Sequence, residues 1–332
     1  MTRSAGVSSS STQSASESPG TPLGSLPGFV YIGVAAFFWG LSASLGRAAF
    51  TGRLLPNSGI RSVDPLILSQ CRTSFSFLAI AMGLIAIRGI KSLRLPWRDA
   101  AQLFVLGLAG VAASNYFYYL AIQRTNVATA IIVQYTAPVW VLLYMVARGE
   151  EHLTAPKMGS VLLAITGIAL VIGLFRHGGI QLDPIGVVAA LIAAFSFSYY
   201  NIGGHYLLAR YDRWTVLLYT TLAASLFWLI VNPPNKIAAA HYSASTWLFL
   251  AVFSFLSVLL PFAFYFAGLE RLVPTKAIIA SCLEPVFSIL IAAIALKEVV
   301  GPVQAIGIVM VLGAIVLAQK SRSALQRVDP ID

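Results

Sequence analysis

The sequence is a series of apolar blocks, most of them about 20 residues long, separated by short polar segments. About 20 residues of α-helix span the roughly 30 Å hydrocarbon core of a bilayer. We count ten such blocks, at residues 28–50, 66–87, 100–122, 126–147, 158–175, 184–208, 214–231, 247–268, 275–296 and 300–319. None of them alternates apolar with polar residues, as the strands of a membrane barrel do. The pattern predicts an all-α integral membrane protein with ten transmembrane helices.

Composition agrees with a chain that is solvated mainly by lipid. Hydrophobic residues make up 58% of the sequence and charged residues only 10%. The 22 Lys and Arg residues occur singly in gaps between the apolar blocks, without a basic stripe, so we expect no nucleic-acid partner. Cys71 and Cys282 both lie inside apolar blocks, where thiols act as small hydrophobic groups and imply no disulfide framework.

The ends of the chain and its basic residues predict an orientation. Residues 1–27 are rich in Ser, Thr, Gly and Pro, which predicts a disordered tail, and residues 320–332 form a second tail. The first apolar block is too long for the core of a signal peptide and should stay in the membrane. Thirteen Lys and Arg residues fall on the side of the N-terminus and six on the opposite side. Because cytoplasmic loops retain positive charge, we expect both termini in the cytoplasm.

The second half of the sequence repeats the first. At an offset of 147 residues, Pro138 aligns with Pro285 and Glu151 aligns with Glu298. Each copy would contain five helices, and an odd number forces the second copy to enter the membrane from the opposite side. Inverted repeats of this kind are typical of carriers that work by alternating access around a site near the membrane midplane.

The first helices of the two copies align at a different offset. Trp39 pairs with Phe197 at an offset of 158 residues, so the first half contains about eleven extra residues. The polar, turn-rich stretch 51–64 is the expected insertion. The two repeats are thus predicted at residues 28–175 and 184–319.

Taken together, these features resemble the EamA-type carriers of the drug/metabolite transporter superfamily. The similarity covers about residues 28–320 and rests on FFWG at 37–40, Arg72, the alanine-to-proline run ending at Pro138, Glu151, LEPVF at 283–287 and Glu298. The resemblance implies a ten-helix fold with cytoplasmic termini, a central cavity and carrier activity, often efflux of amino acids or related metabolites. It also implies a bacterial inner membrane. The sequence departs from the family in its long first loop and in Lys276, where a small polar residue is more typical.

Three ionisable residues within the blocks are predicted to bind substrate. A charged residue at the centre of a membrane helix costs about 2.5–3.5 kcal/mol on insertion scales, so such residues usually face a cavity. Glu284 lies mid-helix, directly before Pro285. Its negative charge must be neutralised by a substrate ammonium group, a coupling proton or an ion pair with Arg72. Arg72 and Lys276 lie nearer to block ends, where the alternative is a side chain that snorkels to the interface. For Arg72, a hydrogen-bond hub between helices is a further alternative.

Aromatic residues and prolines complete the predicted site. Trp39 and Tyr200 lie in the middle of their blocks and are predicted to line the cavity, although packing and interfacial anchoring are the common roles of Trp and Tyr. Pro138 and Pro285 occupy equivalent places in the two halves. Because paired helix interruptions often mark a carrier's site, both are predicted as hinges.

Other functional classes lack their signatures. The sequence contains no nucleotide-binding loop, zinc-protease motif, nucleophile elbow or CxxC pair, so we expect no enzyme, no cofactor and no metal. The cluster Glu150, Glu151 and His152 keeps a membrane-embedded lipid-modifying enzyme as an alternative, and a channel is another. An organic-anion or sugar-phosphate exchanger is the alternative among carriers. The expected partners are a small-molecule substrate, the lipid bilayer and a coupling proton, with the chain a monomer or a homodimer.

Overall fold

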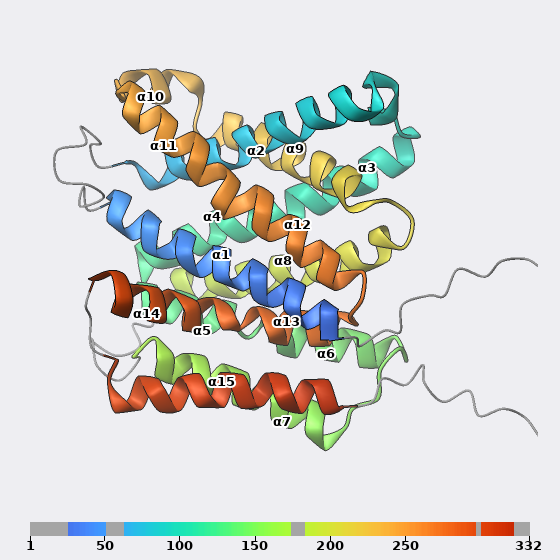
Figure 1. Ribbon diagram of the computed structural model, residues 1–332, viewed down its shortest axis with the longest axis vertical. Helices are drawn as coiled ribbons and strands as arrows, with labels where there is room; N and C mark the ends of the chain where they lie inside the picture. Colours follow the sequence, from blue (N-terminus) through green and yellow to red (C-terminus); the bar gives the residue numbers. More distant parts are fainter. Residues whose placement is uncertain (1–25, 51–62, 174–182, 297–299, 322–332) are drawn as a thin grey trace, which may run out of the picture.

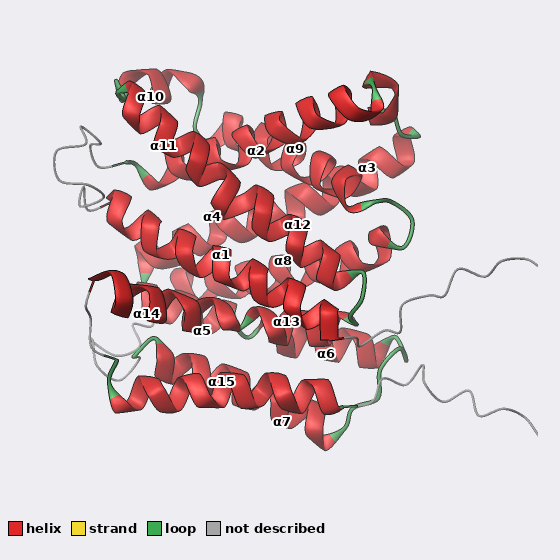
Figure 2. Cartoon of the chain, in the orientation of Figure 1, coloured by secondary structure: helices red, strands yellow, loops and turns green. Residues whose placement is uncertain are grey.

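A computed structural model describes residues 26–50, 63–173, 183–296 and 300–321. This part of the chain folds into helices joined by loops and contains no strand (Figure 2). Most of the predicted N-terminal tail, most of the 51–64 insertion, Glu298 and nearly all of the C-terminal tail lie outside the described residues. The described start of α1 and the described end of α15 lie on the same side of the helix bundle (Figure 1).

Each of the ten predicted blocks contains helix. The helices of the first half are α1 (Leu26–Phe50), α2 (Pro65–Arg88), α3 (Trp97–Val105), η2 (Leu106–Ala112), α4 (Ala113–Arg124), α5 (Val127–Gln134), α6 (Ala137–Ala147) and α7 (Ala155–Val171). Those of the second half are α8 (Pro184–Leu208), α9 (Arg213–Val231), α11 (Ala244–Ser254), η3 (Phe255–Leu259), α12 (Leu260–Leu269), α13 (Pro274–Ser281), α14 (Leu283–Leu296) and α15 (Pro302–Lys320). Two short connecting helices, η1 (Ile90–Leu93) and α10 (Pro234–Ala239), were not predicted.

The described helices are consistent with an integral membrane protein. Nine helical stretches are long and apolar enough to cross a bilayer within the described residues, counting adjoining segments such as α3, η2 and α4 together. α7 is a further apolar helix, with 17 residues. It lies along α15, and the two backbones approach so closely that a Cβ on Gly307 would lie 2.6 Å from the carbonyl oxygen of Gly167.

Local sequence explains where several helices begin. Asp64, Asp183 and Asp212 precede α2, α8 and α9, and the carboxylate of each accepts hydrogen bonds from backbone amides in the first turn of its helix. These bonds satisfy amides that have no acceptor within the helix. α2 and α8 also have proline in their first turn, where the missing amide hydrogen costs no bond.

Helix interruptions recur along the chain at a constant spacing. α5 ends at Gln134 and α13 ends at Ser281, 147 positions later, and in each case a new helix begins within three residues. The π-helical segments η2 and η3 also end 147 positions apart. α1 and α8 both have 25 residues and start 158 positions apart. These spacings are the two offsets read from the sequence.

Candidate functional site

The two interrupted helices meet at their interruptions. The side chain of Tyr135 lies at the break between α5 and α6. It is close enough to the carboxyl group of Glu284, in the first turn of α14, for the two groups to interact. Tyr118, on α4, is close enough for its hydroxyl to interact electrostatically with the same carboxyl group. Glu284 and Tyr135 are both half-buried, and Tyr135 packs against the hydrophobic core. A negative charge in this first turn is also favoured by the dipole of α14.

α1 crosses the start of α14 at a glycine. A Cβ on Gly40 would lie 2.8 Å from the carbonyl oxygen of Glu284 and 2.8 Å from the amide nitrogen of Ser288. Both neighbours are backbone atoms and cannot rotate away, so the crossing needs a residue without a side chain. The last residue of the FFWG motif therefore brings α1 against the LEPVF motif.

α8 crosses α6 in a corresponding way. Ser198 lies 158 positions after Gly40, and its hydroxyl donates a hydrogen bond of 3.2 Å to the carbonyl oxygen of Ala137. Ala137 lies 147 positions before Glu284. The two crossings thus use aligned positions, but Ala137 occupies the place that Glu284 takes in the second half.

Arg72 reaches the same region from α2. One of its terminal nitrogens donates a hydrogen bond of 2.5 Å to the side-chain oxygen of Asn115, and the Asn115 amide donates to the Val111 carbonyl in η2 at 2.7 Å. The Arg72 charge acts on Glu284 electrostatically. No salt bridge joins the two side chains in the described part of the chain, so the direct ion pair considered as an alternative is not formed here.

Trp39 and Tyr200 are joined through shared aromatic neighbours. Ring centroids of Trp39 and Phe262 lie 5.2 Å apart, and those of Tyr200 and Phe262 lie 5.6 Å apart. Trp39 also contacts Tyr265, whose hydroxyl is hydrogen-bonded by the Asn201 amide. Tyr200 is fully buried, whereas Trp39 is partly exposed. Trp39 is thus the member of this pair that can still contact a ligand without rearrangement.

Lys276 belongs to a different cluster from Glu284. It is 5% exposed and interacts electrostatically with Glu151 and Lys157, which form a buried salt bridge of 2.6 Å across the loop between α6 and α7. Lys276 therefore does not share a cluster with Glu284 and Arg72.

Asn115 and Tyr135 were not among the predicted site residues. The position of Tyr135, three residues before Pro138, was a usable signal because it places the side chain at the helix break. Asn115 carried no such signal, since its role comes from its contact with Arg72. No group of three or more His, Cys, Asp or Glu residues that could hold a metal ion occurs among the described residues.

Comparison with known proteins identifies the family. The model of the EamA-like transporter family matches residues 26–173 and again residues 184–319. The uncharacterized inner membrane transporter YicL of Salmonella typhimurium is 22% identical over 87% of this chain and 94% of its own length. The threonine/homoserine exporter RhtA of Escherichia coli K12 is 29% identical over 78% of this chain and 83% of its own length.

A solved structure has the same fold. One protein crystal structure superposes with a TM-score of 0.70 at 21% identity, covering 88% of this chain and 96% of the other. Together with the two family matches, this result confirms the resemblance predicted from the sequence motifs. The chain belongs to the EamA-like transporter family.

Proposed function

We propose that this transporter is a secondary carrier that moves an amino acid or a related small metabolite out of the cell by alternating access. The observation that carries the proposal is the arrangement around Glu284. The half-buried carboxyl group of Glu284 and the half-buried guanidinium group of Arg72 come from different helices and interact electrostatically, without forming a salt bridge.

Such a region fits the two charged groups of an amino acid. The Glu284 carboxylate, supported by Tyr135, would accept hydrogen bonds from the ammonium group. Arg72, oriented by Asn115, would donate to the carboxylate. Trp39 supplies an apolar surface for the substrate side chain. Relatives support this substrate class, since one is a threonine/homoserine exporter and another, from Ancylobacter novellus, an aromatic amino acid exporter.

The proposed mechanism uses ten membrane helices arranged as two inverted five-helix repeats, with both termini in the cytoplasm. The recurrence of helix interruptions at a spacing of 147 residues supports equivalent halves. Pro138 and Pro285 lie in the first turn of α6 and α14, directly after the interruptions, and would act as hinges. A coupling proton would occupy Glu284 when no ammonium group is bound.

The alternatives have less support in the structure. An organic-anion exchanger needs several cations in one cavity, but Lys276 lies with Glu151 and Lys157 rather than with Arg72. A membrane-embedded enzyme needs free acidic groups, yet Glu151 pairs with Lys157 and Glu150 accepts a hydrogen bond from the Tyr206 hydroxyl at 2.6 Å.

Transport by Glu284→Gln tests the proposal. The purified variant in proteoliposomes should remain folded but lose uptake of labelled threonine, or lose its response to a pH gradient. Arg72→Gln should also lose transport. Glu270→Gln is the matched control, because Glu270 pairs with Arg213 and Arg271 at the surface, away from this region.

A structural role for Glu284 gives a different result. In that case Glu284→Gln would reduce stability, and the double variant with Arg72→Gln would restore both stability and transport. A well-folded Glu284→Gln with unchanged kinetics and unchanged pH dependence would remove this residue from the mechanism.

A further inference from the structure

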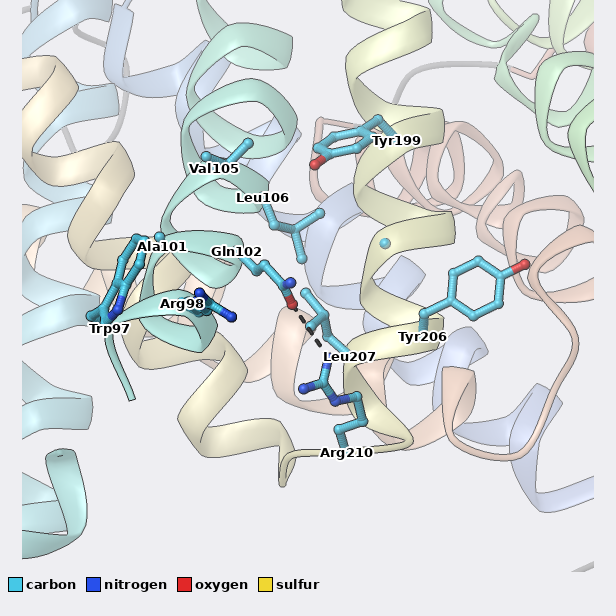
Figure 3. Close-up of a pocket in the computed structure, with 11 residues that line it drawn as sticks. Trp97, Arg98, Ala101, Gln102, Val105, Leu106, Tyr199, Tyr206, Leu207 and Arg210 are labelled. Atoms are coloured by element: carbon cyan, nitrogen blue, oxygen red, sulfur yellow. Dashed lines mark hydrogen bonds between the residues drawn. The ribbon is translucent and has the colours of Figure 1, made fainter. Parts of the chain in front are cut away.

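A pocket of about 630 Å³ lies between α3 and η2 on one side and α8 on the other (Figure 3). Its two ends differ in character. Arg98, Gln102 and Arg210 gather at one end, whereas Val105, Leu106 and Tyr199 form the other. None of the predicted substrate-binding residues lines it.

The pocket opens on the outer surface of the helix bundle. Tyr199 continues an exposed apolar stripe along α8 that includes Ile185, Val188 and Phe195, each about half exposed. These residues are spaced so that they share one face of the helix. A smaller pocket farther along this stripe is lined by apolar residues alone. In a membrane-embedded chain, an exposed face of this kind contacts lipid acyl chains.

The polar end of the pocket carries a net positive charge. Arg210 forms a salt bridge of 3.0 Å with Asp99 and a hydrogen bond of 3.3 Å with Gln102. Arg98 is exposed and lies over the Trp97 ring at 5.7 Å, and it makes no salt bridge with any described residue. One carboxylate therefore faces two guanidinium groups, and Arg98 keeps its hydrogen-bond donors available for an anion.

We propose that this pocket binds one anionic phospholipid. Arg98 and Arg210 contact the phosphate, for which guanidinium groups have suitable geometry, and the adjoining glycerol lies near Gln102. Trp97, which is 75% exposed, sits where Trp residues usually mark the membrane interface. An acyl chain follows the groove past Val105 and Leu106 towards the exposed stripe of α8.

A lipid fits this pocket better than a small anion does. A soluble phosphate would use only the arginine end and leave the apolar length of the groove uncovered. A zwitterionic lipid would fill the groove, but the positive charge of its own head group would lie close to the two arginines. The ligand that satisfies both ends carries a net negative head group and an acyl chain.

The test is lipid binding to the purified full-length chain in detergent. Native mass spectrometry should show more bound dioleoyl phosphatidylglycerol than dioleoyl phosphatidylcholine at equal concentration. Arg98→Gln should weaken phosphatidylglycerol binding about fivefold, which is the effect of about 1 kcal/mol for one basic residue near anionic lipid. Ala101→Phe should also weaken binding, because this exposed position lines the groove and the new ring would fill it without removing charge.

Arg94→Gln is the matched control, because Arg94 is exposed in the same region but does not line the pocket. It should leave lipid binding nearly unchanged. Equal binding of the two lipids, or equal effects of Arg94→Gln and Arg98→Gln, would overturn the proposal. Displacement of the lipid by glycerol 3-phosphate at comparable concentration would also overturn it, since the pocket would then be a small-anion site. Displacement by threonine would assign the pocket to substrate instead.

Discussion

The salt bridge between Glu151 and Lys157 is expected to contribute strongly to stability. Substitutions at the residues of this cluster are expected to differ in their cost. The oxygen and nitrogen of the salt bridge lie 2.6 Å apart, and the two side chains are 1% and 3% exposed. At an effective dielectric constant of about 20, this distance corresponds to an attraction of about 6 kcal/mol. Removing one partner of a buried pair typically costs about 3–5 kcal/mol, because the remaining charge loses its partner without regaining water.

Because Lys276 adds a second lysine to this cluster, substitutions of Glu151, Lys157 and Lys276 should cost different amounts of stability. The cluster holds two ammonium groups and one carboxylate, so Glu151→Gln leaves two buried positive charges that repel each other. We therefore expect Glu151→Gln to lower the free energy of unfolding by about 3–5 kcal/mol. Lys157→Met should cost less, since Lys276 remains near Glu151. Lys276→Met should cost least, because it removes the excess positive charge and leaves the salt bridge intact.

Reversible unfolding in mixed micelles of dodecyl sulfate and a mild detergent measures these differences. Arg148→Gln provides the control, since its salt bridge with Glu150 is longer, 3.7 Å, and the Arg148 side chain is 61% exposed. Such an exposed pair should contribute less than about 1 kcal/mol. If Glu151→Gln unfolds like Arg148→Gln, or if Lys276→Met is as costly as Glu151→Gln, the electrostatic reasoning is wrong.

Two further predictions concern packing and topology. Gly40→Ala should lower the thermal stability of the protein, by about 1–3 kcal/mol in the free energy of unfolding, because its Cβ would overlap backbone atoms of α14. Gly33→Ala is the control in the same helix, where a Cβ meets no atom within 4 Å, and a comparable loss there would refute the packing explanation. Single cysteines placed at each terminus and in the loop 89–96 should react with a membrane-impermeant thiol reagent only from the cytoplasmic side. Labelling of the termini from opposite sides would contradict the ten-helix arrangement.

Much of the helical framework could be predicted because the bilayer limits both composition and length. The block at 184–208 coincides with α8, and the other boundaries differ by a few residues at most. Hydropathy does not indicate where a helix breaks, but Pro138 and Pro285 did, since proline leaves a backbone carbonyl without its helical partner. No comparable residue predicted the π-helical segments η2 and η3.

The contacts within the candidate site were harder to predict. Glu284 and Arg72 could be recognised because ionisable residues are costly in a membrane. Their neighbours Tyr135 and Asn115 carry no charge and gave no comparable indication. Lys276 stood out for the same reason. Its neighbours, Glu151 in the loop before α7 and Lys157 in the first turn of α7, lie more than 100 residues away in sequence, and only the folded chain shows that they meet.

At aligned positions, the two halves share the helix crossings around the candidate site but differ in their side chains. Each helix break is crossed by the first helix of the other half: α1 crosses α14 at Gly40, and α8 crosses α6 at Ser198. The residue contacted at the crossing is Ala137 in the first half and Glu284 in the second. Only one of these two aligned positions therefore has a carboxyl group. Under the proposed alternating access, exchange of conformation between the halves would move Glu284 relative to Tyr135, because the two residues lie on different breaks. The contact between their side chains would then change during the transport cycle, and substrate or proton binding at Glu284 would act directly on that change.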